Sequence, residues 1–234
     1  EGTAPGLRLH LIPQRHLGSR LWPLQDPLWT ARASRAIGRI ENLDLVFAPE
    51  WRGHAALYAR RKVRPPLVTN LTTSLEQVMA VSPGFPDYRP MRLQIASQTR
   101  AERWQSERSD ALIACSQAIL DWTRELWRVE AIPSVVIPNA IDIERVRQLA
   151  LAEPPAAFPG DGPVVFYSGR LEPRKGVDIL VKAMARVWGR YPEAKLVMAG
   201  QDWNSHEGPM SEVLRRLAGD YADRLVLLGK LPTH

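Results

Sequence analysis

This sequence has little cysteine, no long apolar run and no leader-like start. Each of these absences argues against a class of protein. One cysteine, Cys115, among 234 residues excludes an internal disulfide framework and fits a reducing compartment. No run approaches the roughly 18 apolar residues that a membrane-spanning helix needs. No basic stretch followed by an apolar core stands near residue 1, so no signal peptide is visible. We therefore expect a cytoplasmic protein, and a peripheral location at the inner face of a membrane stays open.

Motifs that define several other enzyme classes are missing as well. The sequence has no Gly-x-x-x-x-Gly-Lys-Ser/Thr phosphate loop, no Gly-x-Ser-x-Gly nucleophile elbow and no Gly-x-Gly-x-x-Gly dinucleotide fingerprint. His206 and Glu207 are adjacent, but no His-Glu-x-x-His pattern or other metal-ligand spacing surrounds them. A P-loop NTPase, a hydrolase of the elbow type and a dehydrogenase are thus disfavoured. We expect neither a metal ion nor a cofactor.

Positive charge is abundant but dispersed along the chain. There are 31 Lys and Arg residues against 25 Asp and Glu, which gives a net charge of +6. Apart from a short cluster at residues 60–64, the basic residues are scattered. A nucleic-acid-binding protein would array them on one face to contact successive phosphates. We expect no nucleic-acid partner.

The most informative stretch is VVFYSGRLEPRKG at residues 164–176. Its first four residues predict a short buried strand, and apolar residues recur at helical spacing from Val177 onwards. Gly169 lets the backbone approach a ligand closely. Arg170 and Lys175 stand between strand and helix, where the helix N-terminus adds partial positive charge. Such a loop suits a diphosphate, although these residues taken alone more often form a surface loop with solvated charges.

This stretch resembles the donor-binding turn of family four glycosyltransferases, also called glycosyltransferase group 1. In that family a strand is followed by Gly-Arg-Leu, a few variable residues and Lys-Gly. Three other segments resemble the same family in the same order: VIPNAID (136–142), AKLVMAG (194–200) and RLVLLGKLP (224–232). The resemblance implies an α/β protein of the GT-B type, with two Rossmann-like, doubly wound parallel-sheet domains. It also implies metal-independent transfer of a hexose from a nucleoside-diphosphate sugar, the co-substrate, to an acceptor hydroxyl with retention.

The resemblance also assigns roles to particular residues. The positions that hold the donor diphosphate correspond to Gly169, Arg170 and Lys175. Possible supporting positions are Glu172, Gly200, Lys230 and Leu231. On the acceptor side the candidates are Glu50, His54 and Thr72. Thr72 departs from the family pattern, because members often carry a histidine there. Glu172 either orients Lys175 or caps the next helix. The family's Glu-rich donor-sugar motif would lie beyond His234, so no catalytic residue is assigned.

Two domains are expected from the alternation of strands and helices, which predicts parallel sheets. Residues 1–158 would form an acceptor-side domain that lacks its first βα units. Residues 159–234 would form the first half of the nucleotide-sugar-binding domain. The sequence is therefore expected to be a fragment truncated at both ends and inactive alone. The acceptor, whether a lipid, a polysaccharide or a small metabolite, stays open, as does peripheral membrane contact.

Patterning also predicts the elements that carry these residues. The expected strands lie at 7–11, 44–53, 66–74, 110–116 and 134–137, and the expected helices at 30–41, 53–61, 90–109, 117–129 and 142–149. The helix at 90–109 is polar, and residues 151–163 have a linker-like composition. Thr73 and Glu76 have capping-box spacing, and Ser116 and Asp142 are expected caps. Cys115, inside an apolar strand, is expected to be a buried and inert thiol.

A second function fits part of this pattern. A Rossmann-like module that binds a nucleotide or another anion without catalysis would use the same loop at 168–176. It would bind a nucleoside diphosphate but would transfer no sugar. Binding and turnover measured on one protein therefore separate the two functions.

Overall fold

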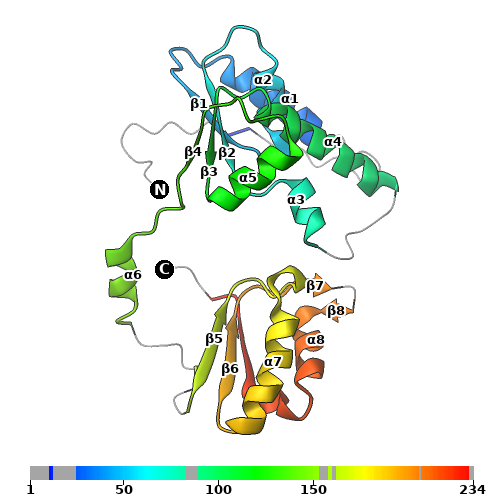
Figure 1. Cartoon of the computed structure of the whole chain (residues 1–234), viewed down its shortest axis with the longest axis vertical. Coiled ribbons are helices and arrows are strands. Elements are labelled where there is room, and N and C mark those ends of the chain that lie inside the picture. Colours follow the sequence, from blue (N-terminus) through cyan, green and yellow to red (C-terminus); the bar gives the residue numbers. More distant parts are fainter. Residues whose placement is uncertain are drawn as a thin grey trace. The chain divides into compact units, whose positions relative to one another are not determined.

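The computed structural model describes residues 11–12, 25–82, 89–152, 158–159, 162–205 and 207–231. The chain forms two compact units, one of residues 1–80 and 85–140, the other of residues 81–84 and 141–234. Each unit has a parallel sheet with helices, as expected of an α/β protein (Figure 1). The assignment of acceptor-side and donor-side domains that meet at 158/159 stays a prediction. The expected strand at 7–11 and the linker at 151–163 lie largely outside the described residues.

The first unit is built on a four-stranded sheet in the order β1-β2-β3-β4, with every pair parallel. The strands are β1 (Val46–Pro49), β2 (Leu67–Leu71), β3 (Ala111–Ala114) and β4 (Ser134–Val136). The helices are α1 (Gln25–Ile37), the 3-10 turn η2 (Trp51–Gly53), α2 (Ala56–Ala59), α3 (Leu75–Ala80), α4 (Arg89–Ser106) and α5 (Gln117–Leu126). Among described residues, no helix combines the length and apolar character needed to cross a bilayer.

Two apolar clusters form the core of this unit. One lies under α2 and joins strands β1 and β2 through Val46, Ala48, Ala55, Tyr58, Ala59 and Leu67. The other lies under α5 and comprises Leu71, Leu112, Ala114, Leu120, Trp127 and Val129. Alternate residues of β2 are buried, as the period of a strand requires. Side chains of the strands therefore pack the sheet against its helices.

Helix α4 corresponds to the expected polar helix at 90–109, but its polar side chains are buried. Gln98, Glu102, Gln105 and Ser106 are at most 6% exposed. Buried polar groups require hydrogen-bond partners. Gln105 finds them in the backbone around β1, since its Oε1 accepts from the Ala55 N–H and its Nε2 donates to the Pro49 carbonyl. The polar residues of α4 therefore include some that hydrogen-bond to the backbone of a neighbouring loop, and not only residues that face solvent.

Helix caps follow the sequence closely, with one shift. Ser116 accepts from the Ile119 N–H and Asp142 accepts from the Arg145 N–H, as expected. The capping box of α3 is one residue later than predicted. Ser74 Oγ accepts from the Gln77 N–H while the Gln77 side chain accepts from the Ser74 N–H. The pair Thr73 and Glu76 has the same spacing, so sequence alone could not choose between the two registers.

The second unit has a three-stranded parallel sheet in the order β5-β6-β9. Its elements are α6 (Ile143–Leu149), β5 (Val164–Ser168), the 3-10 turn η3 (Pro173–Lys175), α7 (Val177–Arg190), β6 (Lys195–Ala199), the short strands β7 (Asn204–Ser205) and β8 (Gly208–Pro209), α8 (Met210–Ala218), the 3-10 turn η4 (Gly219–Arg224) and β9 (Leu225–Gly229). Helices α7 and α8 pack side by side against one face of the sheet (Figure 1). Phe166, on the opposite face of β5, is 53% exposed.

Candidate functional site

Three loops converge at the carboxyl edge of the second sheet. The Gly169 N–H donates to the Ala199 carbonyl at 2.9 Å, and the Leu171 N–H donates to the Gln201 carbonyl at 2.9 Å. The Gly200 N–H in turn donates to the Gly229 carbonyl at 2.8 Å. Strand pairing thus continues past β5 and β6, and it fixes the loop at 169–176 against its neighbours. This edge is where parallel sheets bind ligands.

Glycine is required where two of these loops touch. A Cβ atom added to Gly200 would lie 1.8 Å from the Gly169 carbonyl oxygen, and Gly200 has a φ of +154°. No side chain fits between these two backbones. The structure shows that Gly200 is needed for a contact between neighbouring loops, and its predicted role in supporting a diphosphate site stays a prediction.

Arg170 is held by neighbours on two sides. Its guanidinium lies 3.3 Å from Glu172 Oε1 and 5.3 Å from the centre of the Trp203 ring. Glu172 also pairs with Arg174 at 2.8 Å, and only 8% of Glu172 is exposed. Among the described residues, the Glu172 carboxylate pairs with two arginines and has no ion pair with Lys175; Glu172 occupies the N-cap position of η3 but makes no side-chain cap hydrogen bond. The Glu172 carboxylate therefore holds the guanidinium groups of Arg170 and Arg174 close to each other.

Lys175 is a second exposed cation of the loop. It ends the turn η3, and Gly176, with a φ of +68°, then redirects the chain into α7. Within the part of the chain that the structure describes, the Lys175 ammonium has no ion-pair or hydrogen-bond partner. Lys230 and Leu231 follow β9 and are also exposed. The loop therefore presents one oriented guanidinium and one free ammonium beside the N-terminus of a 14-residue helix, an arrangement that attracts phosphate groups.

In the first unit, the structure brings Glu50 and Thr72 together. Glu50 follows β1 and is 1% exposed, and its Oε1 accepts from the Thr72 N–H at 2.7 Å. Burial raises the pKa of the Glu50 carboxyl to about 7, with a further contribution from the negative charge of Glu102. His54 lies on the same stretch but packs against the Trp29 ring with centroids 4.3 Å apart, and burial lowers its pKa. Two of the three acceptor-side candidates therefore share one hydrogen-bonded cluster.

Cys115 also reaches this cluster. It follows β3 by one residue, is only half-buried, and its Sγ lies 4.0 Å from the Thr72 carbonyl oxygen. The expectation of a buried thiol inside a strand is therefore wrong. The strand ends at Ala114, so the next side chain belongs to the carboxyl edge, together with Thr72.

Replacing Glu50 with glutamine is expected to change how stability depends on pH. Glutamine keeps an oxygen for the Thr72 N–H but carries no charge. Because the folded-state pKa of Glu50 is raised, its contribution to stability is full below pH 4.5 and is lost as pH rises through about 7. The unfolding free energy of wild type relative to Glu50→Gln should fall by about 3 kcal/mol between pH 4.5 and 8. Urea unfolding across that range measures it, and parallel pH profiles would contradict it.

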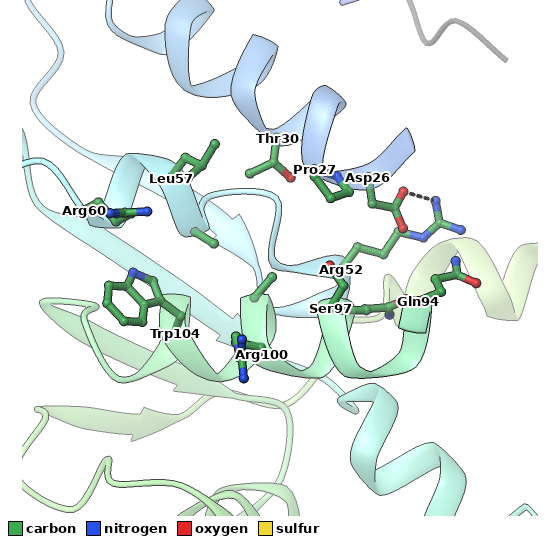
Figure 2. Close-up of a pocket in the computed structure, with 13 residues that line it drawn as sticks. Asp26, Pro27, Thr30, Arg52, Leu57, Arg60, Gln94, Ser97, Arg100 and Trp104 are labelled. Carbon is green, nitrogen blue, oxygen red and sulfur yellow. Dashed lines mark hydrogen bonds and ion pairs between the residues drawn. The ribbon is translucent and has the colours of Figure 1, made fainter. Parts of the chain in front are cut away.

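A cavity of about 470 Å³ lies within the first unit and was not predicted from the sequence. Figure 2 shows Trp104 and Arg60 at one end of it and the Asp26–Arg52 ion pair, at 3.1 Å, at the other. On α4 it is lined by Gln94, Ser97, Gln98, Arg100, Ala101 and Trp104. These residues recur at helical spacing, but most of them are polar, so the sequence did not indicate that this side of the helix borders a cavity.

The basic cluster at 60–64 serves the fold in part. Arg61 donates to the Ser34 carbonyl at the end of α1. Arg64 pairs with Asp110 and donates to the Arg108 carbonyl beside β3. These two side chains are held by the protein itself, so the cluster offers fewer free cations than its sequence suggests.

Comparison with known proteins gives consistent matches for both units. Residues 2–145 match the family model "Glycosyltransferase Family 4", and residues 152–232 match "Glycosyl transferases group 1". The chain is 33% identical over 117 residues to the phosphatidyl-myo-inositol mannosyltransferase of Mycolicibacterium smegmatis, covering 49% of this chain and 28% of that protein. It is 34% identical over 146 residues to the glycogen synthase of Mycobacterium tuberculosis, covering 57% and 34%. The chain thus spans about a third of these relatives' length.

Solved structures resemble the chain over most of its length. Sucrose-phosphate synthase from Thermosynechococcus elongatus has a TM-score of 0.61 at 20% identity, covering 96% of this chain and 54% of that one. HepE of Anabaena, in complex with UDP and glucose, has a TM-score of 0.58 at 20% identity, covering 94% and 55%. These neighbours are GT-B glycosyltransferases, which confirms the fold class expected from the sequence.

Proposed function

The chain belongs to glycosyltransferase family 4, and from this premise we propose that its protein moves a hexose from a nucleoside-diphosphate sugar to an acceptor hydroxyl, with retention and without a metal ion. The observation that carries the proposal is the loop at 169–176. It holds Arg170 and Lys175 beside the N-terminus of α7, at the carboxyl edge of a parallel sheet. The donor diphosphate would bind there.

The two cations have different tasks in this proposal. Glu172 and Trp203 already orient Arg170, so its guanidinium loses little freedom when it binds a phosphate. Lys175 has rotational freedom and can follow charge as it develops on the leaving diphosphate. Both groups stabilise the departing anion more strongly than the bound donor, which lowers the barrier to breaking the glycosidic bond. Together the two positive charges can do this without a metal ion.

The first unit would supply the acceptor side. Thr72, with the buried Glu50 hydrogen-bonded behind it, lies at the carboxyl edge of its sheet, the edge at which parallel sheets bind ligands. By their names, the matched relatives act on a phosphatidylinositol and on glycogen, which are a lipid and a polysaccharide. The acceptor of this protein is accordingly left open among a lipid, a polysaccharide and a small metabolite.

Calorimetric titration of UDP, GDP and ADP into the full-length protein tests this function. One nucleotide should bind with micromolar affinity, and the matching sugar donor should be consumed only when an acceptor or water accepts the sugar. Binding without any turnover would instead identify the non-catalytic nucleotide-binding module. If none of the three nucleotides binds, the assignment of the loop at 169–176 is wrong.

A further inference from the structure

A buried carboxylate on α4 ties together two loops of the first unit. Glu102 is 0% exposed, and its two oxygens accept three hydrogen bonds. Oε1 accepts from the Arg52 N–H at 2.9 Å and from Gln98 Nε2 at 2.7 Å, and Oε2 accepts from the Leu75 N–H at 2.8 Å. Burial raises the pKa of Glu102, and the three donors act in the opposite direction.

The two backbone donors come from the loops that follow β1 and β2. Arg52 lies two residues after Glu50, and Leu75 lies three residues after Thr72. One carboxylate therefore bridges the segments that carry both acceptor-side candidates. The bridge is buried, so water does not compete for these hydrogen bonds.

The turn at Arg52 is a conformation that needs such support. Arg52 has a φ of +64°, which a non-glycine residue seldom adopts, and Gly53 has a φ of +58°. A Cβ atom on Gly53 would lie 2.4 Å from the Ala101 backbone, so the turn is pressed against α4. The hydrogen bond from the Arg52 N–H to Glu102 fixes the turn at this point of close contact.

We propose that Glu102 is a positioning residue for the acceptor: it holds the loops at 50–54 and 72–75 at a fixed separation, and so places Glu50 and Thr72 for the acceptor hydroxyl. This inference rests on the proposed function, because it assumes that these loops contact the acceptor. Glu102 itself, fully buried beneath them, acts through the two backbone amides and does not touch substrate.

An isosteric substitution tests the chemistry of the bridge. All three partners of Glu102 donate, and two of them are backbone N–H groups that cannot become acceptors. In Glu102→Gln the new NH₂ group must therefore face a donor, and one loop loses its tie. Glu107→Gln is the matched control, because Glu107 lies just past the end of the same helix and its carboxylate pairs with Arg103 and the Arg128 N–H at the surface.

The experiment compares both variants with wild type in the full-length protein. Amide hydrogen exchange should rise in segments 50–54 and 72–76 of Glu102→Gln while the rest of the first unit stays protected. Phosphatidylinositol vesicles, glycogen and glucose serve as acceptor probes. For whichever probe is glycosylated, the acceptor KM should rise three- to tenfold in Glu102→Gln, with nucleoside-diphosphate affinity within twofold of wild type. Glu107→Gln should match wild type in every measurement.

Several outcomes would overturn the inference. Unchanged exchange in both loops, or a loss of nucleotide affinity equal to the loss of acceptor affinity, shows that Glu102 positions nothing on the acceptor side. If Glu102→Gln does not fold, Glu102→Asp replaces it, since its shorter side chain keeps the charge but cannot reach both amides. If no nucleotide binds at all, the proposed function fails by itself, and the exchange measurement still decides whether Glu102 orders the loops.

Discussion

Replacing Lys175 with alanine is expected to raise the dissociation constant for the preferred nucleoside diphosphate between ten- and a hundredfold and to abolish most sugar transfer. A hydrogen bond to a charged group contributes about 1.5–3 kcal/mol, and each 1.4 kcal/mol is a factor of ten in affinity. Lys175 has no partner among the described residues, so its removal leaves no buried group unsatisfied. Calorimetry and a transfer assay on the full-length protein measure the two losses.

The control for this substitution is Lys182→Ala. Lys182 lies on α7, about one and a half turns after the helix begins. Its ammonium pairs only weakly with Asp178, at 3.5 Å on the surface. It has the same charge but stands away from the loop, so nucleotide affinity should stay within twofold of wild type. Equal losses in both lysine variants would mean that net charge, not position, attracts the nucleotide. Near-wild-type transfer by Lys175→Ala and by Arg170→Ala would show that the diphosphate binds elsewhere.

The loop at 169–176 could be located from sequence because its signals are local. Strand β5, the glycine turn and the start of α7 at Val177 all lie within fourteen residues, and each has its own composition. The pairing of Glu172 was missed for the opposite reason. Arg170, Arg174 and Lys175 all lie within three residues of Glu172, and only the backbone of the turn η3 decides which of them its carboxylate contacts.

The hydrogen bonds that Glu102 and Gln105 make with the loops of the first unit could not be predicted from sequence, because the partners are far apart along the chain. Glu102 and Arg52 are separated by 50 residues, as are Gln105 and Ala55. A glutamate or glutamine in a polar helix is usually solvated, and propensity makes no distinction for one that binds a backbone amide. The position of α4 along the chain was therefore predictable. That some of its polar side chains would point into the protein, against the loops, was not. The cavity beside Trp104 was hidden for the same reason.

Replacing Gly200 with alanine is expected to cost at least about 2 kcal/mol of the second unit's stability, since overpacking and a forced backbone conformation each cost about 1–3 kcal/mol. The new methyl group would lie 1.8 Å from the Gly169 carbonyl oxygen, and both atoms belong to backbones fixed by strand pairing. The loops can accommodate it only by separating. Because Gly169 begins the loop that carries Arg170 and Lys175, nucleotide affinity should fall together with stability.

Gly189→Ala is the matched control, and it should act in the opposite direction. Gly189 lies within α7, and a Cβ atom there would meet nothing within 4 Å. Alanine in a helix is favoured over glycine by about 0.8–1 kcal/mol, so this variant should be slightly more stable and should bind nucleotide as wild type does. Urea unfolding and nucleotide titration of both variants give four numbers. If Gly200→Ala unfolds at the same urea concentration as Gly189→Ala, the contact between the two loops does not constrain this edge, and the geometry proposed for the diphosphate site loses its foundation.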